Sequence, residues 1–221
     1  MQFPQVPQSI KANLVALFAA LGIGTGGSVY IAEVQNDKAI QQQVQVIQQD
    51  RYLQAVVEDQ GTSLAIKTAM ILGWYYESSN EVITKPYVDK LGKGQPLTVC
   101  NGITGKGVIA NKIYTPKECY ELEKGRYLGA EADASKLFRF WSSYTPLTQA
   151  IFLDFIHNKG SGALRTSTLL RMANAGNLLG ACKQNERWNK GTVNGVSVVL
   201  KGLDIRAKAN SAICQKESQH G

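Results

Sequence analysis

The sequence predicts an α+β fold, in which a small sheet-containing lobe precedes a larger helical lobe and a cleft lies between them. Residues 63–77 form an apolar run with helical spacing. Residues 87–110 are instead rich in Pro, Gly and β-branched residues, a composition typical of a small antiparallel sheet. Beyond residue 115 the pattern is helical again. A chain of 221 residues can hold one such domain and an appendage.

The appendage begins with an uncharged segment. Residues 14–32 carry no charge for 19 positions, a length that just crosses a bilayer as a helix. Four glycines between residues 22 and 27 weaken this helix, each by about 1 kcal/mol relative to Ala. We interpret residues 1–32 as a weak, uncleaved signal-anchor rather than a cleaved signal peptide, because the run exceeds a usual signal core. Lys11 should hold the start of the chain in the cytoplasm and send the rest across.

A spacer follows the anchor. Residues 33–62 are Gln-rich, and Ile40, Val44 and Ile47 recur at helical spacing. We expect one connecting helix with a thin apolar stripe, broken at Gly61. The remaining residues, 63–221, then form the main domain.

The charge balance and the histidine count exclude several function classes. Lys and Arg number 24 against 17 Asp and Glu, which gives a net charge of +7 and suits an anionic partner such as nucleic acid, phospholipid or peptidoglycan. The chain has only two histidines, His157 and His220, and no zinc-type spacing or phosphate-binding glycine loop. We therefore expect neither a metal site nor a histidine-based triad.

Four cysteines follow the anchor. An even number in an exported domain indicates two disulfides, and four cysteines allow three pairings. We favour the pairs that each bracket a compact unit, Cys100–Cys119 and Cys182–Cys214.

Helix starts are marked by two Thr-Pro pairs. Thr115 and Pro116, with Glu118 three residues after the Thr, form a capping box. Thr145 and Pro146 repeat the pattern before an apolar run that ends ahead of Gly160. A further short helix should stop at Gly176.

Two carboxylates and a hydroxyl lie around the predicted sheet. Glu77 ends the apolar helix, where an apolar setting would favour the neutral, proton-donating form of a carboxyl group. Asp89 lies in a Gly- and Lys-rich loop that would keep it ionised, and Thr98 could hold a water by its hydroxyl. Cleavage of a glycosidic bond needs such a pair, one acid for the departing oxygen and one carboxylate on the other face.

The stretch resembles the phage-type lysozymes of glycoside hydrolase family 24, whose motif runs Glu, a short loop, AYxD, a turn, then TxGxGHT or TxCxGxT. Residues 87–89 match the aspartate element and residues 98–105, TVCNGITG, match the strand. Ordered similarity continues over about residues 64–214. The resemblance implies a lysozyme-like fold and an inverting reaction. In it Glu77 is the general acid, Asp89 the base or electrostatic partner and Thr98 the water-holding residue, while Asn158, Ser167 and Thr168 line the glycan groove.

The chain departs from the family pattern in two loops. Eleven residues separate Glu77 from Asp89 and eight separate Asp89 from Thr98, where the family usually has eight and five. Insertions are tolerated in such loops. The first one leaves Glu81 as a competing acid, although Glu77 follows the apolar helix as the family's acid does. Ile103 also occupies a position often held by His.

The resemblance implies a muramidase that hydrolyses the β-1,4 bond between N-acetylmuramic acid and N-acetylglucosamine in peptidoglycan, for host cell lysis and phage release. No cofactor or nucleic-acid partner is expected, and we expect a monomer. The weak anchor resembles the signal-anchor-release segment of certain endolysins, which predicts a protein tethered to the inner membrane and later periplasmic. Two alternatives stay open, a lytic transglycosylase acting on the same bond and a non-catalytic, membrane-tethered wall-binding protein.

Overall fold

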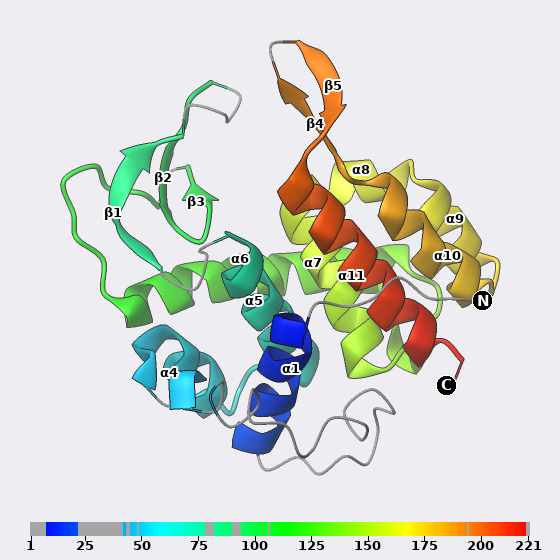
Figure 1. The fold of residues 1–221 in the computed structure, drawn as a ribbon, viewed down its shortest axis with the longest axis horizontal. Helices are drawn as coiled ribbons and strands as arrows, with labels where there is room; N and C mark the ends of the chain where they lie inside the picture. The colour runs from blue at the N-terminus through cyan, green and yellow to red at the C-terminus, as the bar shows by residue number, and fades with distance from the viewer. Residues whose placement is uncertain are drawn as a thin grey trace.

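The computed structural model describes residues 8–21, 42, 45–47, 49–77, 82–89, 94–105, 107–193 and 195–219. Within them a group of helices carries a three-stranded antiparallel sheet and a separate two-stranded hairpin. In Figure 1 the sheet and the hairpin project from the same side of the helical body, and the long helix α6 (Pro116–Leu137) runs from the sheet into that body. The predicted α+β class is confirmed.

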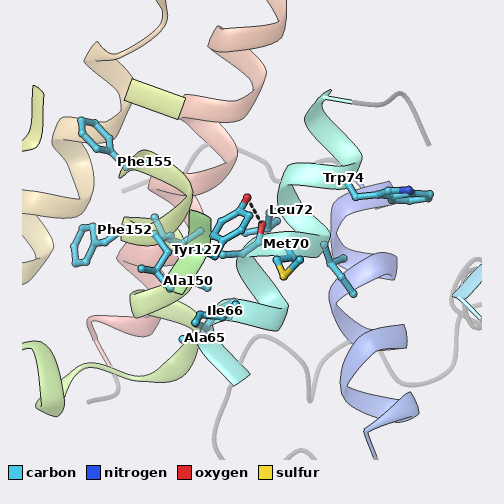
Figure 2. Packing of buried hydrophobic residues seen from close by; sticks show 14 of the residues in the cluster. Ala65, Ile66, Met70, Leu72, Trp74, Tyr127, Ala150, Phe152 and Phe155 are labelled. Atoms are coloured by element: carbon cyan, nitrogen blue, oxygen red, sulfur yellow. Dashed lines mark hydrogen bonds between the residues drawn. The ribbon is translucent and has the colours of Figure 1, made fainter. Parts of the chain in front are cut away.

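Helix α5 (Leu64–Glu77) lies at the centre of the core. Ten consecutive residues, Ala65–Trp74, are buried, as expected of a helix that is apolar on every side. It packs against α6 and α7 (Pro146–Lys159) on one side and α1 (Gln8–Ala20) on the other (Figure 2). The predicted helix over residues 63–77 is confirmed to within one residue, and it ends at Glu77.

Helix α1 (Gln8–Ala20) lies against the core rather than apart from it. Its Ile10, Leu14 and Leu17 have no exposed surface, and Trp74 of α5 points toward it in Figure 2. No helix in the described part of the chain is both long enough and apolar enough to cross a bilayer. Residues 22–32 of the predicted anchor lie outside the described residues.

The end of the predicted spacer forms α4 (Arg51–Glu58). Asp50 caps this helix by accepting hydrogen bonds from the Tyr52 and Leu53 amides at 2.8 and 3.0 Å. A turn at Gly61 then separates α4 from α5, where the break is predicted. Residues 33–41 of the spacer lie outside the described residues.

The sheet is formed by β1 (Ile83–Val88), β2 (Leu97–Cys100) and β3 (Ile103–Thr104), in that order. It begins earlier than the predicted range of 87–110. The β1–β2 pairing sets Tyr87 opposite Thr98 and Val88 opposite Leu97. The register shifts between Ile83 and Tyr87, a stretch of edge strand that contains Pro86, which has no amide hydrogen to donate.

The C-terminal part of the chain is helical apart from one hairpin. The capping box at Thr115 and the Thr145 cap of α7 are both present, as predicted. Gly176, with φ of 81°, follows the short helix α9 (Thr168–Asn174), where the end of a helix is predicted. The hairpin was not predicted. The elements after α7, in chain order, are α8 (Ser161–Arg165), α9 (Thr168–Asn174), α10 (Leu178–Gln184), β4 (Lys190–Val193), β5 (Val196–Val199) and α11 (Lys201–Glu217); two short 3-10 turns, Trp141–Ser143 and Asn185–Arg187, precede α7 and β4.

Both predicted disulfides are present. Cys100–Cys119 joins the end of β2 to the first turn of α6, and Cys182–Cys214 joins α10 to α11. The first bond therefore ties the sheet to the helical body, and the second ties the last helix to it.

Candidate active site

Glu77 is held at the end of a buried helix by an ion pair. Its side chain is 31 % exposed, and its carboxylate accepts a hydrogen bond from Nη1 of Arg206 on α11, 129 residues further along the chain. The prediction of a purely apolar setting for this carboxyl group is therefore wrong. A charged guanidinium lies beside it, because α11 packs across the end of the core.

Arg206 is shared between two carboxylates. Its Nε and Nη2 donate to the two oxygens of Asp154 on α7 at 2.9 and 2.7 Å, a two-pronged pairing, while Nη1 reaches Glu77. Arg206 is 5 % exposed and Asp154 is 1 % exposed. Burial alone would lower the pKa of Arg206, but Asp154 and then Glu77 outweigh it and raise that pKa above its ordinary value. The guanidinium thus stays charged inside the protein.

Two neighbours complete this cluster. Asn210 donates its side-chain amide to Asp154 at 2.6 Å and accepts a hydrogen bond from the Tyr76 hydroxyl at 3.3 Å. The Arg206 guanidinium carbon lies 4.9 Å from the centre of the Tyr76 ring. Hydrogen bonds and ion pairs therefore join α5, α7 and α11 next to Glu77.

Asp89 and Thr98 are brought together by the β1–β2 pairing. The Asp89 amide and the Thr98 hydroxyl both donate to the carbonyl of Pro96, at 3.0 and 3.1 Å. Asp89 is half-buried, and Thr98 is 2 % exposed. Because Tyr87 lies opposite Thr98 and two residues before Asp89, these three side chains belong to one face of the sheet.

Tyr87 connects the two candidate carboxylates electrostatically. Burial raises the pKa of its hydroxyl, and the charges of Asp89 and Glu77 raise it further. Asp89 comes from the sheet and Glu77 from the core helix, yet both act on the same phenol. The competing acid Glu81 lies outside the described residues.

The predicted groove residues line two hollows that meet at Trp188. Asn158 lines a small one of about 20 Å³ with Asp154 and Arg206. Ser167 and Thr168 line a larger one of about 310 Å³. The Ser167 hydroxyl also has a structural use, since it donates to the Leu164 carbonyl at 2.7 Å and accepts from the Leu170 amide at 3.0 Å.

A second buried carboxylate, that of Glu123, binds the residue that follows strand β2. Glu123 of α6 accepts hydrogen bonds from the backbone and side-chain amides of Asn101 at 3.1 and 3.0 Å and from the Tyr52 hydroxyl. Asn101 follows Cys100, which has φ of 57° at the end of β2. Burial raises the pKa of Glu123 to about 7, although its hydrogen bonds lower it.

Sequence reasoning missed Asp154, Arg206 and Glu123. One signal was available for Asp154, which interrupts the apolar run of residues 151–156. A carboxylate in such a run is buried with the rest of the helix face and needs a hydrogen-bonding or charged partner. The identity of that partner depends on the packing of α11, which no local pattern gives.

Comparison with known proteins defines the class of protein, a lysozyme-type glycoside hydrolase. The family model for phage lysozyme matches residues 78–210. That range contains Asp89, Thr98, Asp154 and Arg206, and it starts one residue after Glu77. Two relatives, the SAR-endolysins of Bacteriophage PS119 and Enterobacteria phage P21, are 34 % and 32 % identical over 155 and 160 residues. These matches cover 70 % of this chain and 87 % and 88 % of the relatives.

Solved structures share the fold. The endolysin from Escherichia coli O157:H7 phage FAHEc1 has a TM-score of 0.58 at 22 % identity, with 71 % of this chain and 93 % of that chain covered. The muramidase domain of SpmX from Asticaccaulis excentricus also reaches 0.58, at 17 % identity, with 69 % and 95 % covered. The chain belongs to the phage lysozyme family. It is an endolysin of the muramidase type, and its substrate is peptidoglycan.

Proposed function

We propose that Glu77 is the general acid of this muramidase, that Asp89 is its base or electrostatic partner, and that Thr98 holds the attacking water. In this scheme Glu77 protonates the oxygen that leaves the muramic acid unit. Asp89 acts from the opposite face of the sugar, and the anomeric configuration inverts, which calls for carboxyl groups roughly 6.5–9.5 Å apart. The observation that carries the proposal is that Asp89 and Thr98 both donate to the Pro96 carbonyl in the sheet, while Glu77 ends the core helix with its side chain 31 % exposed.

The surroundings of the individual side chains support these proposed roles. The Glu77 side chain stays 31 % exposed at the end of α5, where a substrate oxygen can reach it. Thr98 donates its hydroxyl hydrogen to Pro96 and so presents only its lone pairs to a water. Asn158 and Thr168, beside Trp188, would contact the glycan on the helical side.

The acid is tested with purified peptidoglycan and three proteins. Glu77→Gln should lower the release of soluble fragments at least about 100-fold, the usual contribution of a positioned acid or base. Glu81→Gln should retain most of the wild-type rate, and thermal unfolding of all three proteins verifies the fold. Loss of activity in Glu81→Gln with retention in Glu77→Gln would move the acid to Glu81.

We further propose that residues 1–32 act as a signal-anchor that tethers the enzyme to the inner membrane before it becomes periplasmic, and that residues 33–62 act as a spacer. The uncharged run and its glycines support this, as do relatives named SAR-endolysins at more than 30 % identity. The first part of the run, in α1, is buried against α5. The same apolar surface can therefore be covered by lipid or by the protein's own core.

A further inference from the structure

We propose that Asp154 is the positioning residue of the acid: it binds Nε and Nη2 of Arg206, leaves only Nη1 for Glu77, and offsets the guanidinium charge so that Glu77 can carry the proton it donates. The inference rests on the proposed role of Glu77. It concerns a residue that never touches the substrate, since Asp154 lies behind Arg206 with 1 % of its surface exposed.

The need for such a residue follows from the chemistry of a general acid. An arginine side chain does not lose its proton in proteins, so Arg206 is a permanent positive charge. A carboxyl group beside an uncompensated guanidinium has its pKa lowered by about 1–3 units, which favours the ionised form. An ionised Glu77 has no proton to give. Contact with Arg206 would therefore work against catalysis unless a second negative charge offset it.

The geometry assigns this second charge to Asp154. Three donors, Nε and Nη2 of Arg206 and the Asn210 amide, point at its two oxygens. Asp154 is thus enclosed as a fixed counter-ion. Glu77 receives one donor from Arg206 and stays 31 % exposed. The two carboxylates are unequal, and only Glu77 is placed to exchange a proton with a substrate.

The other groups around the cluster do not supply the missing negative charge. His157 on α7 has a pKa lowered by burial and by Arg206, and Tyr127 on α6 has a pKa raised by burial, so both are neutral near pH 7. Lys159 on α7 has a pKa lowered by burial and by Arg206. Among the described residues, Tyr87 on β1 and Arg126 and Glu123 on α6 also act on the cluster. The oxygens of Glu123 accept from Asn101 and Tyr52 rather than from Arg206, and burial raises its pKa to about 7.

The test is the pH dependence of fragment release by Asp154→Asn, which keeps the shape and removes the charge. The alkaline limb of the activity profile should move down by about 1–3 pH units, so that activity is lost at pH 7 and regained at lower pH. A second variant, Asp154→Asn with Arg206→Gln, removes both charges and should return the limb to within about one pH unit of wild type. Asp204→Asn, whose carboxylate pairs with Lys208, is the charge-matched control and should not move it.

A purely structural role of Asp154 gives a different result. Activity would then fall by the same factor at every pH, or the double variant would not restore the limb, and either outcome overturns the inference. If Asp154→Asn alone does not fold, Arg206→Gln is compared with the double variant: the limb of Arg206→Gln should lie at higher pH, because it keeps the Asp154 charge, and equal limbs would overturn the inference. If Glu77→Gln is fully active, the proposed acid fails. If Glu77→Gln is inactive and the limb of Asp154→Asn is unmoved, only this inference fails.

Discussion

Glu123 is a buried carboxyl group that contacts the end of strand β2. It is 1 % exposed, and it joins Tyr52 of α4 to Asn101, which follows β2. Burial raises its pKa from 4.5 to about 7. The folded protein therefore binds this proton more tightly than the unfolded chain, and its stability depends on pH through this one group.

The sign of that dependence is fixed by the direction of the shift. Between pH 4.5 and about 7 the folded state holds more protons at Glu123 than the unfolded state, so the free energy of unfolding falls as the pH rises through this window. The loss should be on the order of 3 kcal/mol. Glu123→Gln should remove it. The difference in unfolding free energy between wild type and variant, measured by urea denaturation from pH 4 to pH 8, should change across the window, and a constant difference would contradict the assignment.

At the residue scale, the sequence identifies candidate site residues such as Glu77 but not the residues with which they form ion pairs. Glu77 is placed by its position at the end of an apolar helix, and that helix ends where the pattern predicts. Its contact with Arg206 spans 129 residues and the Asp154–Arg206 contact spans 52, so neither follows from local spacing. The catalytic roles of Glu77, Asp89 and Thr98 remain predictions.

At the scale of elements, the packing of α5 against α6 depends on one glycine. A Cβ added to Gly73 would lie 2.5 Å from the Tyr127 hydroxyl, closer than real contacts allow. That hydroxyl is fully buried and donates to the Ala69 carbonyl at 3.2 Å (Figure 2). Gly73 thus makes room for the Tyr127 hydroxyl four residues before Glu77.

Gly73→Ala should therefore destabilise the protein, although Ala is the better helix former by about 1 kcal/mol. Overpacking of this kind costs about 1–3 kcal/mol. Tyr127→Phe removes the clashing oxygen, so the same Gly73→Ala change should cost much less, or stabilise, in that background. A double-mutant cycle by thermal unfolding measures the coupling. Equal costs in both backgrounds would show that the Tyr127 hydroxyl is not the obstacle.

The elements themselves differ in how well the sequence predicts them. The Thr-Pro starts of α6 and α7 are local signals, because the Thr hydroxyl caps the helix whose first residue is the Pro, and both were found. The β4–β5 hairpin was missed although Asn194-Gly195 is a strong hairpin signal. Its valines at 193, 196 and 199 are exposed, so no buried face marks the strands.

At the scale of the whole molecule, we propose that residues 1–32 occupy two environments, the inner membrane and the surface of the protein's own core. Replacing the four glycines at positions 22, 24, 26 and 27 with Leu adds apolar side chains worth about 0.5 kcal/mol each on an insertion scale, besides helix propensity. The variant should stay in the membrane fraction and lyse cells late. Wild type should appear at full length in both membrane and periplasmic fractions. A soluble form that begins near residue 33 would instead indicate signal-peptide cleavage.

The proposed mechanism requires that water is the group that accepts the cleaved glycan. The most direct measurement is mass analysis of fragments from purified peptidoglycan digested in water enriched in oxygen-18, with Glu77→Gln as the blank. A hydrolase that uses Glu77, Asp89 and Thr98 as proposed should place one labelled oxygen at each new reducing end. Unlabelled anhydro-muramyl ends throughout would show that no water is activated, and the enzyme would then be a lytic transglycosylase.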